Sequence, residues 1–317
     1  MNITGLDALV FGVDDLAACS RFLVDYGLAD AGGGRFEAAD GTAVLIRARD
    51  DASLPPALPT RTQLRQTVYR VADAATLDAI AAELGRDRPV QRTADGAVES
   101  ADDLGFALRF QLDTRKPVAQ TAEVVNLPGS APARPLNHVA VDDNADLRPR
   151  TLSHVVYFVP DEARATAFYR DRLGFRETDR LVGAGPFLRP AGTPEHHTLF
   201  LIQTPPFLQG CEHFTFHMAG PGAVLQAGSR FQAKGHASFW GPGRHRMGSN
   251  WFWYFKGPLG CNIEYDADMD LHDDAWSPRA VPMSADASQL FLFQEREKWI
   301  PAGGPPPGAG GKPPGAH

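Results

Sequence analysis

Residues 6–13 form a mostly apolar run, two acidic residues follow, and apolar positions then recur at helical spacing as far as Tyr26. This order predicts a strand, a turn and an amphipathic helix that ends at Gly27. The same order returns from Leu152 onward, with Asp161 placed to cap the helix and a glycine placed to end it. The chain therefore contains at least two copies of one structural unit.

A weaker pair of similar segments adds two more copies of this unit. Residues 66–71 resemble residues 213–218, and each segment is followed by a helix candidate and then by short strands. The chain thus divides into four units, each with one strand, one helix and several short strands. Two units fill residues 1–117 and two fill residues 151–268.

The segments outside these units have a different composition. Residues 118–150 carry four prolines and predict a linker, with one short strand at His138–Val141. Residues 269–300 form an extension that we expect to pack near the functional site. Residues 301–317 hold six prolines and six glycines, so we expect this tail to be disordered.

Composition and charge narrow the functional classes. The 317 residues are 43% hydrophobic and 22% charged, as in ordinary globular proteins, and the formal net charge is −7. Without a basic stripe, nucleic acid is not an expected partner. Without an apolar run of about 18 residues, a membrane span is not expected either. The beginning of the chain does not resemble a signal peptide, and three isolated cysteines predict no disulfide framework, so we expect a cytoplasmic protein.

Three ligand-type residues occupy predicted strands of the second half: His154, His213 and Glu264. The repeat gives their counterparts in the first half, which are the non-ligand residues Ala8, Gln66 and Arg109. All three ligands are thus lost together in the other copy, which favours one shared metal site over three unrelated strand residues. Two imidazoles and one carboxylate leave three positions of an octahedral metal open, as in non-haem Fe(II) oxygenases.

His217 lies two strand positions beyond Thr215 and four beyond His213, so all three share one face of the strand. We keep His217 as a candidate near the metal and the substrate. A fully solvated histidine, or one packed in the core, explains the same pattern equally well.

The order and spacing of these residues resemble a known family. The matching pieces are Leu152–Val156, Glu212–His217 and Gly257–Tyr265, with 59 residues between the two histidines and 51 from His213 to Glu264. They resemble type I extradiol ring-cleavage dioxygenases of the vicinal oxygen chelate superfamily. This resemblance implies an α+β fold of four βαβββ modules paired into two barrel-like domains. It also implies a metal-free first half and a metal, Fe(II) or alternatively Mn(II), in the second.

The resemblance also implies three catalytic residues: His245, Tyr254 and His196. His245 follows a Gly-Pro-Gly turn and, with Tyr254, would hydrogen-bond the oxygen ligands; a plain turn and one more core aromatic residue are the alternatives. His196 would exchange protons with the substrate, as a histidine can near neutral pH. The family has His-Asp where this chain has two histidines; strand alternation favours His196 and turns His197 to the other face. A polar loop with two solvated histidines is the alternative.

Aromatic residues near these strands predict an apolar pocket for a substituted or bicyclic ring. The residues assigned to it are Phe187, Phe239, Trp240, Phe252 and Trp253, and His197 and His217 complete the candidate substrate contacts.

These features together predict an Fe(II)-dependent dioxygenase that cleaves a catechol-type ring with O2. A glyoxalase-like isomerase or lyase, and a non-catalytic protein that sequesters a ligand, are the alternatives on the same fold. The expected partners are the catechol, O2 and further copies of this chain in a homo-oligomer. The sequence does not name the catechol.

Overall fold

The computed structural model describes residues 1–119 and 123–293, and it contains four successive βαβββ modules. The first consists of β1 (Ile3–Val13), α1 (Leu16–Tyr26), β2 (Ala29–Asp30), β3 (Arg35–Glu37) and β4 (Ala43–Ala48). The second consists of β5 (Leu64–Val71), α2 (Ala74–Leu84), β6 (Gln91–Arg92), β7 (Val98–Ala101) and β8 (Ala107–Leu112).

The second half repeats this order. Its first module consists of β9 (Thr151–Val159), α3 (Glu162–Ala167) with the π-helical turn η1 (Phe168–Arg172), β10 (Arg176–Val182), β11 (Gly185–Arg189) and β12 (Leu199–Gln203). After the short 3₁₀ helix η2 (Pro206–Leu208), its second module consists of β13 (Gly210–His217), α4 (Pro221–Ala233), β14 (Ser238–His245), β15 (Trp251–Lys256) and β16 (Asn262–Ala267). The modules predicted from the repeat are confirmed.

Local signals set the helix ends, and the predicted cap at Asp161 and the predicted end at Gly27 are confirmed. The Asp15 carboxylate accepts a 2.9 Å hydrogen bond from the backbone N–H of Ala18, and Asp161 caps α3 in the same way through Arg164 at 3.0 Å. Gly27 ends α1 with φ at 112°, a left-handed conformation that glycine adopts without strain.

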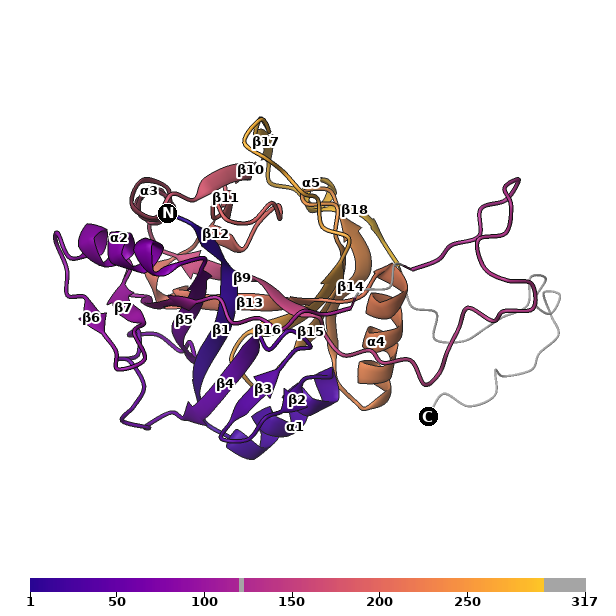
Figure 1. The fold of residues 1–317 in the computed structure, drawn as a ribbon, viewed down its shortest axis with the longest axis horizontal. Coiled ribbons are helices and arrows are strands. Elements are labelled where there is room, and N and C mark those ends of the chain that lie inside the picture. Colours follow the sequence, from indigo (N-terminus) through magenta and orange to yellow (C-terminus); the bar gives the residue numbers. More distant parts are fainter. Residues whose placement is uncertain (120–122, 294–317) are drawn as a thin grey trace, which may run out of the picture.

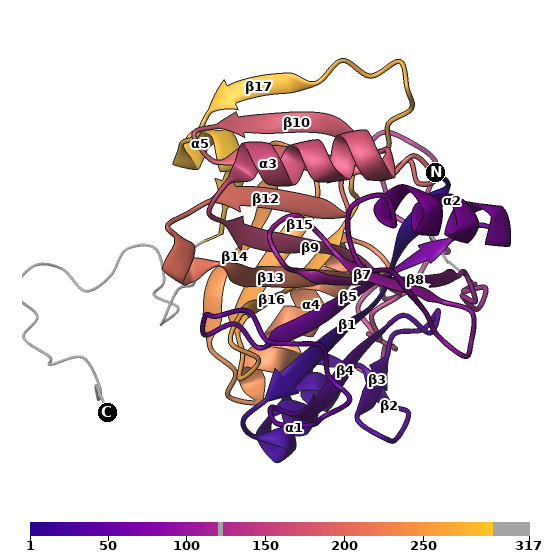
Figure 2. The same ribbon diagram turned by 90° about the vertical axis from the view of Figure 1, so that its left-hand side faces the viewer.

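The modules pair within each half through their first strands (Figures 1 and 2). β1 and β5 run antiparallel and join an eight-stranded sheet in the order β2-β3-β4-β1-β5-β8-β7-β6. β9 and β13 do the same in a ten-stranded sheet, in the order β17-β10-β11-β12-β9-β13-β16-β15-β14-β18. This architecture confirms the predicted α+β fold.

The C-terminal extension adds a strand to each edge of the second sheet. β17 (Arg279–Pro282) pairs with β10, and β18 (Gln289–Leu292) pairs with β14. The short helix α5 (Ala285–Ser288) connects them and, in Figure 1, lies at the open side of the curled sheet.

One hydrophobic core joins the two halves. The rings of Phe11 on β1 and Phe214 on β13 pack with centroids 5.4 Å apart, and buried apolar residues of both halves form one continuous cluster. This burial of apolar surface is the main force that holds the two sheets against each other.

The prediction of a strand at His138–Val141 is wrong. In the described part of the linker these residues have no regular structure, and Val139 and Val141 are 75% and 71% exposed. The segment runs far out from the sheets (Figure 1), so no neighbouring strand can take up its backbone hydrogen bonds. The predicted disordered tail, residues 301–317, lies outside the described residues, as do residues 294–300 of the extension. Among the helices that the structure describes, none is long and apolar enough to cross a bilayer.

Candidate active site

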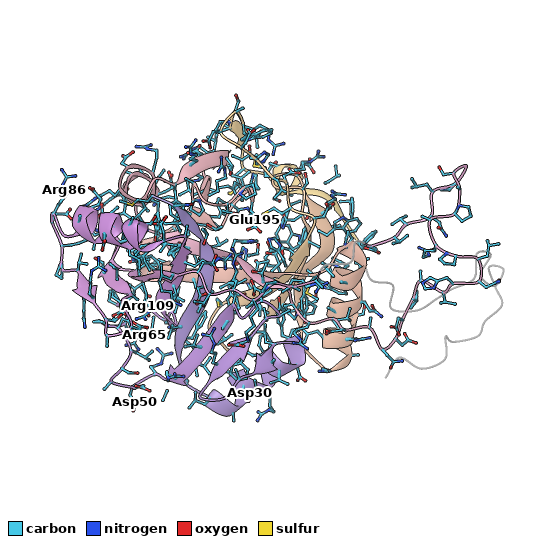
Figure 3. The ribbon with its side chains drawn as sticks, viewed as in Figure 1. Asp30, Asp50, Arg65, Arg86, Arg109 and Glu195 are labelled. Carbon is cyan, nitrogen blue, oxygen red and sulfur yellow. The ribbon has the colours of Figure 1, made fainter. Side chains whose placement is uncertain are left out.

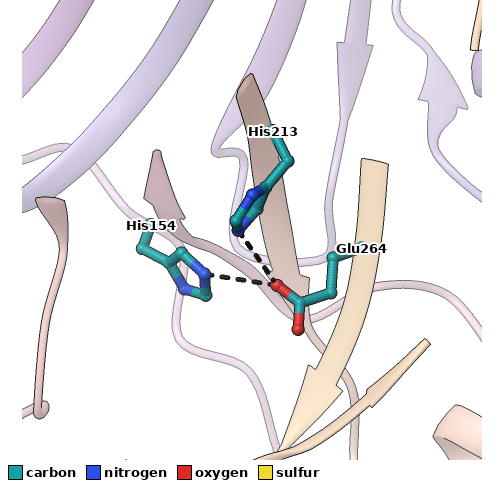
Figure 4. Close-up of side chains that lie close together, drawn as sticks. All are labelled: His154, His213 and Glu264. Atoms are coloured by element: carbon teal, nitrogen blue, oxygen red, sulfur yellow. Dashed lines mark ion pairs between the residues drawn. The ribbon is translucent and has the colours of Figure 1, made fainter. Parts of the chain in front are cut away.

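Three neighbouring strands carry the candidate metal ligands. His154 lies on β9, His213 on β13 and Glu264 on β16, and β13 lies between the other two strands in the sheet. Thr215 of β13 is directly opposite both His154 and Glu264, so the sheet register brings the three ligands to one face (Figure 4).

The three side chains lie close enough to share one ion. His154 Nε2 is 3.2 Å and His213 Nε2 is 3.5 Å from Glu264 Oε2, and one ligand atom from each residue lies within 4.8 Å of the others. All three side chains are buried.

Unsatisfied polar atoms support a metal at this position. Within residues 1–119 and 123–293, His213 Nε2 and Glu264 Oε1 are buried without a hydrogen-bond partner. Buried polar atoms are normally paired, so these two atoms fit a missing cation. Burial opposes ionisation of Glu264, but His154 and His245 hold the pKa of its carboxyl well below the usual range. Burial lowers the pKa of His154, which favours the neutral imidazole that binds metals.

The outward-facing nitrogens of both histidines are held by neighbouring side chains. Ser153 Oγ lies 2.9 Å from His154 Nδ1, and Glu212 contacts His213 Nδ1 and is itself held by Asn262 at 3.0 Å. Such contacts direct each Nε2 toward the centre. The hydroxyl of Thr215 adds a third contact, donating to Glu264 Oε2 at 2.5 Å and lying 2.9 Å from His154 Nε2.

In the first half, ion-paired side chains occupy the positions that are equivalent to the candidate metal ligands. Arg109, which is labelled in Figure 3, is the counterpart of Glu264 and donates to Glu99 at 2.8 Å and to Asp95 at 2.5 Å. Gln66, the counterpart of His213, also donates to Glu99 at 3.2 Å. These side chains satisfy one another and offer no comparable ligand set.

A cavity of about 220 Å³ opens beside the three candidate ligands. Its polar wall contains His154, His213, His197, His245 and Tyr254. The rest of the wall is mostly apolar and is formed by Val156, Leu181, Phe187, Phe200, Ile202, Phe239, Trp240 and Met247.

His245 and Tyr254 reach this cavity together. His245 Nδ1 donates to the Ser288 carbonyl oxygen at 2.8 Å, and the Tyr254 hydroxyl lies 3.2 Å from His245 Nε2. His245 Nε2 is also 3.5 Å from Glu264 Oε1. Both side chains therefore lie where ligands of a bound metal would be within hydrogen-bonding distance.

The structure places His197, not His196, on the cavity wall, so the predicted orientation of this pair is wrong. The rings of His197 and His154 have centroids 4.2 Å apart, whereas His196 is fully buried behind His197 and contacts Asp179. Both histidines precede β12, which begins at Leu199, and neither lies in a strand: His196 is in a bend and His197 has no regular structure. Strand alternation therefore does not apply to them.

Other predicted contacts also lie away from the cavity. Phe252 is fully buried and stacks on the far side of His245, with ring centroids 4.1 Å apart. Trp253 packs against α4 at Gly228, on the other face of β15. His217 contacts Asp266 at 2.7 Å and Glu195 at 3.3 Å instead of the cavity. Shared strand faces do not ensure a shared cavity, because the curved sheet carries the end of β13 away from it.

Several site residues were not predicted from the sequence. Thr215 shares the strand face of His213, and this spacing was a usable signal. Asp179, Asn250 and Ser288 come from distant segments, and no local pattern marks them. Asn250 and Ser288 line the cavity, and Ser288 belongs to the C-terminal extension.

The four βαβββ modules and the group of two histidines and one carboxylate define a metal-binding protein of the vicinal oxygen chelate type. Residues 151–265 match the family model for the Glyoxalase/Bleomycin resistance protein/Dioxygenase superfamily. This match covers the second half of the chain, which is therefore similar to members of this superfamily.

Two curated proteins with similar sequences are a metapyrocatechase and a biphenyl-2,3-diol dioxygenase by name. Metapyrocatechase 2 of Cupriavidus necator is 39% identical over 146 residues, which cover 46% of this chain and 44% of that protein, so this match spans less than half of the relative. Biphenyl-2,3-diol 1,2-dioxygenase of Paraburkholderia xenovorans (strain LB400) is 29% identical over 304 residues, which cover 90% of this chain and 91% of that protein.

Solved structures share the fold at low sequence identity. A Mn(II)-bound glyoxalase from Novosphingobium aromaticivorans has a TM-score of 0.71 at 21% identity, covering 91% of this chain and 90% of that one. BphC, a halotolerant catechol dioxygenase, has a TM-score of 0.69 at 17% identity, covering 92% and 95%. These likenesses support the fold alone.

Proposed function

We propose that this protein is an Fe(II)-dependent extradiol dioxygenase, which opens the ring of a catechol-type aromatic compound and incorporates both atoms of O2. The observation that carries the proposal is the set of His154, His213 and Glu264 beside a cavity with a mostly apolar wall. Two imidazoles and one carboxylate are the donor set of non-haem iron oxygenases. Two similar proteins are named metapyrocatechase 2 and biphenyl-2,3-diol 1,2-dioxygenase.

When bound, a ferrous ion would supply the redox chemistry that lets an electron-rich ring react with dioxygen. The chain contributes binding and proton transfer. Phe187, Phe200 and Ile202 hold the ring and keep water away from it. His197 accepts a proton from a catechol hydroxyl and returns it later. His245 and Tyr254 donate hydrogen bonds to the oxygen atoms of the bound reactants.

The structure gives less support to the two alternative functions. A glyoxalase-like isomerase would need a fourth protein ligand, whereas the metal-type cluster in the described residues contains three side chains. A protein that only sequesters a ligand would have no need for buried, partnerless ligand atoms. The same fold hosts a Mn(II)-bound glyoxalase, so the reaction itself has to be measured.

The experiment is anaerobic purification, metal analysis and an oxygen-electrode assay with a panel of catechols. We expect one iron per chain, oxygen uptake equal to catechol consumed, and two ¹⁸O atoms in the product from ¹⁸O2. Isomerisation of a thiol adduct without oxygen uptake would support the glyoxalase-like alternative. Ligand binding without turnover would support sequestration.

The choice of metal and the assembly are part of this proposal. Reconstitution of the metal-free chain with Fe(II) or Mn(II) decides between the two ions, and we expect the Fe(II) form to be the active one.

We also propose that the protein is a cytoplasmic homo-oligomer. Sedimentation of the purified protein would test its assembly, and cell fractionation would test its location.

A further inference from the structure

Behind His197, a row of buried side chains leads from the cavity to the edge of the second sheet. His197 Nδ1 lies 2.9 Å from His196 Nδ1, and His196 Nε2 lies 2.9 Å from Asp179 Oδ2. Asp179, on β10, is fully buried. Arg279, on β17 of the C-terminal extension, donates to its carboxylate from the backbone N–H at 2.9 Å and from Nε at 3.0 Å.

The carboxylate determines which nitrogen of His196 carries hydrogen. Burial alone would raise the pKa of Asp179, but hydrogen bonds from His196 and Arg279 outweigh burial and lower this pKa to about 2. An ionised carboxylate can only accept hydrogen bonds. His196 Nε2 must therefore be the donor in the contact with Asp179.

The charge of His196 follows from its surroundings. Arg279 already balances the negative charge of Asp179, so a protonated His196 would place an unbalanced positive charge in a fully buried position. His272, whose ring centroid is 5.5 Å from that of His196, adds no negative charge. His196 is then neutral, with hydrogen on Nε2 and a free lone pair on Nδ1.

This tautomer determines the tautomer of His197. Because His196 Nδ1 can only accept, His197 Nδ1 must donate, and His197 Nε2 is left without hydrogen. His197 lines the cavity with its Nδ1 engaged behind it, so Nε2 is the nitrogen available to a substrate. Thr178 stabilises the arrangement by donating to the His196 carbonyl oxygen at 2.6 Å.

We propose that Asp179 and His196 are positioning residues that hold His197 in the tautomer whose free Nε2 accepts the catechol proton. This inference rests on the proposed function. The proton moves from a catechol hydroxyl to Nε2, which leaves a catecholate and an imidazolium. The imidazolium keeps its Nδ1–H bond to His196 and later returns the Nε2 proton to the oxygen-bearing product. The C-terminal extension thus contributes to the site through Arg279, although β17 lies at the sheet edge (Figure 2).

Asp179→Asn is the informative variant. Arg279 donates to both carboxylate oxygens, but its backbone N–H is fixed on Oδ1 at 2.9 Å, whereas its guanidinium, which also reaches Oδ2, is 44% exposed and can turn into solvent. The new amide therefore places its oxygen at the Oδ1 position and its NH2 group toward His196. His196 Nε2 must then accept, its Nδ1 must donate, and the tautomer of His197 reverses. Asp171→Asn, a change of an exposed carboxylate that pairs with Arg170 at 2.6 Å, is the matched control.

The first measurement is ¹⁵N NMR of the histidine rings in the full chain loaded with diamagnetic Zn(II). We expect hydrogen on Nδ1 of His197 and on Nε2 of His196 in the wild type, and the reverse in Asp179→Asn. This readout does not depend on activity, so it separates a failure of the inference from a failure of the proposed function. Hydrogen on Nε2 of His197 in the wild-type chain would overturn the inference.

The second measurement is turnover of the iron-loaded enzyme. We expect kcat of Asp179→Asn to fall roughly 10²-fold, with iron content and anaerobic catechol binding unchanged, since a misplaced proton removes only the acid–base contribution. If that variant does not fold, His196→Asn and His196→Phe replace it: Asn retains an acceptor near the position of Nδ1 and should keep more activity than Phe. Equal activity of these two variants, or an unchanged kcat in Asp179→Asn, would contradict the proposal.

Discussion

The Tyr26 hydroxyl, at the end of α1, donates a 2.6 Å hydrogen bond to the backbone carbonyl oxygen of Glu264. Tyr265 returns a 2.7 Å hydrogen bond to the carbonyl oxygen of Tyr26, and the two phenol rings stack with centroids 4.0 Å apart. The counterparts of the three candidate ligands in the first half are not metal ligands, yet this half holds in place the strand that carries the carboxylate. We infer that its role is to support the site.

Tyr26→Phe tests this supporting role. The change leaves the buried carbonyl of Glu264 without its partner, so we expect a loss of about 1–3 kcal/mol in the free energy of unfolding and weaker metal binding. Chemical denaturation and a metal titration measure the two effects. Tyr265→Phe is the control: it should cost similar stability but leave metal affinity unchanged. Equal metal affinity in both variants would mean that the halves are merely packed together.

Removal of any one candidate ligand should abolish metal binding. We expect His154→Ala, His213→Ala and Glu264→Ala to purify without iron and to lack activity, because two remaining ligands hold the ion too weakly. Gln66→Ala, at the position equivalent to His213 in the first half, should retain one iron per chain. Full iron occupancy in His213→Ala, measured by plasma emission spectroscopy, would show that the metal binds elsewhere.

His197→Phe should separate proton transfer from binding. The variant should keep its iron and bind catechol anaerobically, while turnover falls roughly 10²–10⁴-fold, the usual contribution of a positioned acid–base group. His236→Phe, a change at a histidine that stacks on Phe231 away from the cavity, should have nearly normal turnover. A loss of only a few-fold in His197→Phe would assign the proton transfer to His245.

The apolar wall should select the substrate. Burying an additional aromatic ring against it is worth about 1.5–3 kcal/mol, so we expect kcat/KM for a bicyclic diol to exceed that for a carboxylated catechol by roughly 10- to 100-fold. Phe187→Ala should reduce this preference, because Phe187 stacks on Phe200 at 4.0 Å in the cavity wall. Steady-state oxygen uptake gives both constants. Equal kcat/KM values for the two substrates would contradict the proposed apolar recognition.

Asp102 predicts how stability depends on pH. Burial raises the pKa of its carboxyl from 3.8 to about 6 in the folded protein, although two backbone N–H groups and the Tyr169 hydroxyl donate to it. A raised folded pKa stabilises the protein below pH 3.8, and this contribution is lost as the pH rises through 6. Relative to wild type, Asp102→Asn should therefore gain about 3 kcal/mol between pH 3.5 and pH 7.

Urea unfolding at a series of pH values measures this gain. Asp50→Asn, at an exposed position, should follow the wild-type curve across the same range. A constant difference between wild type and Asp102→Asn at every pH would show that the carboxyl keeps its ordinary pKa in the fold.

The sequence by itself determined the modules and the candidate ligand set. The repeated order of strand, acidic turn and helix is a local pattern, and Asp15 and Asp161 act as caps through contacts within one helical turn. His154, His213 and Glu264 were recognisable because the repeat aligns them with Ala8, Gln66 and Arg109. Each ligand lies within a regular strand, where neighbouring modules fix which face a side chain takes.

Only the tertiary structure decided which histidine of the adjacent pair reaches the cavity. His196 and His197 lie in the irregular segment before β12, where strand periodicity does not determine the direction of a side chain. His196 is held behind its neighbour by Asp179, and Arg279 holds Asp179 from a strand added at the sheet edge. The strand predicted in the linker does not form for a related reason. Val139 and Val141 have a suitable local pattern, but no neighbouring strand pairs with them. Local periodicity describes a residue's immediate backbone, whereas these outcomes depend on which distant segments the fold brings into contact.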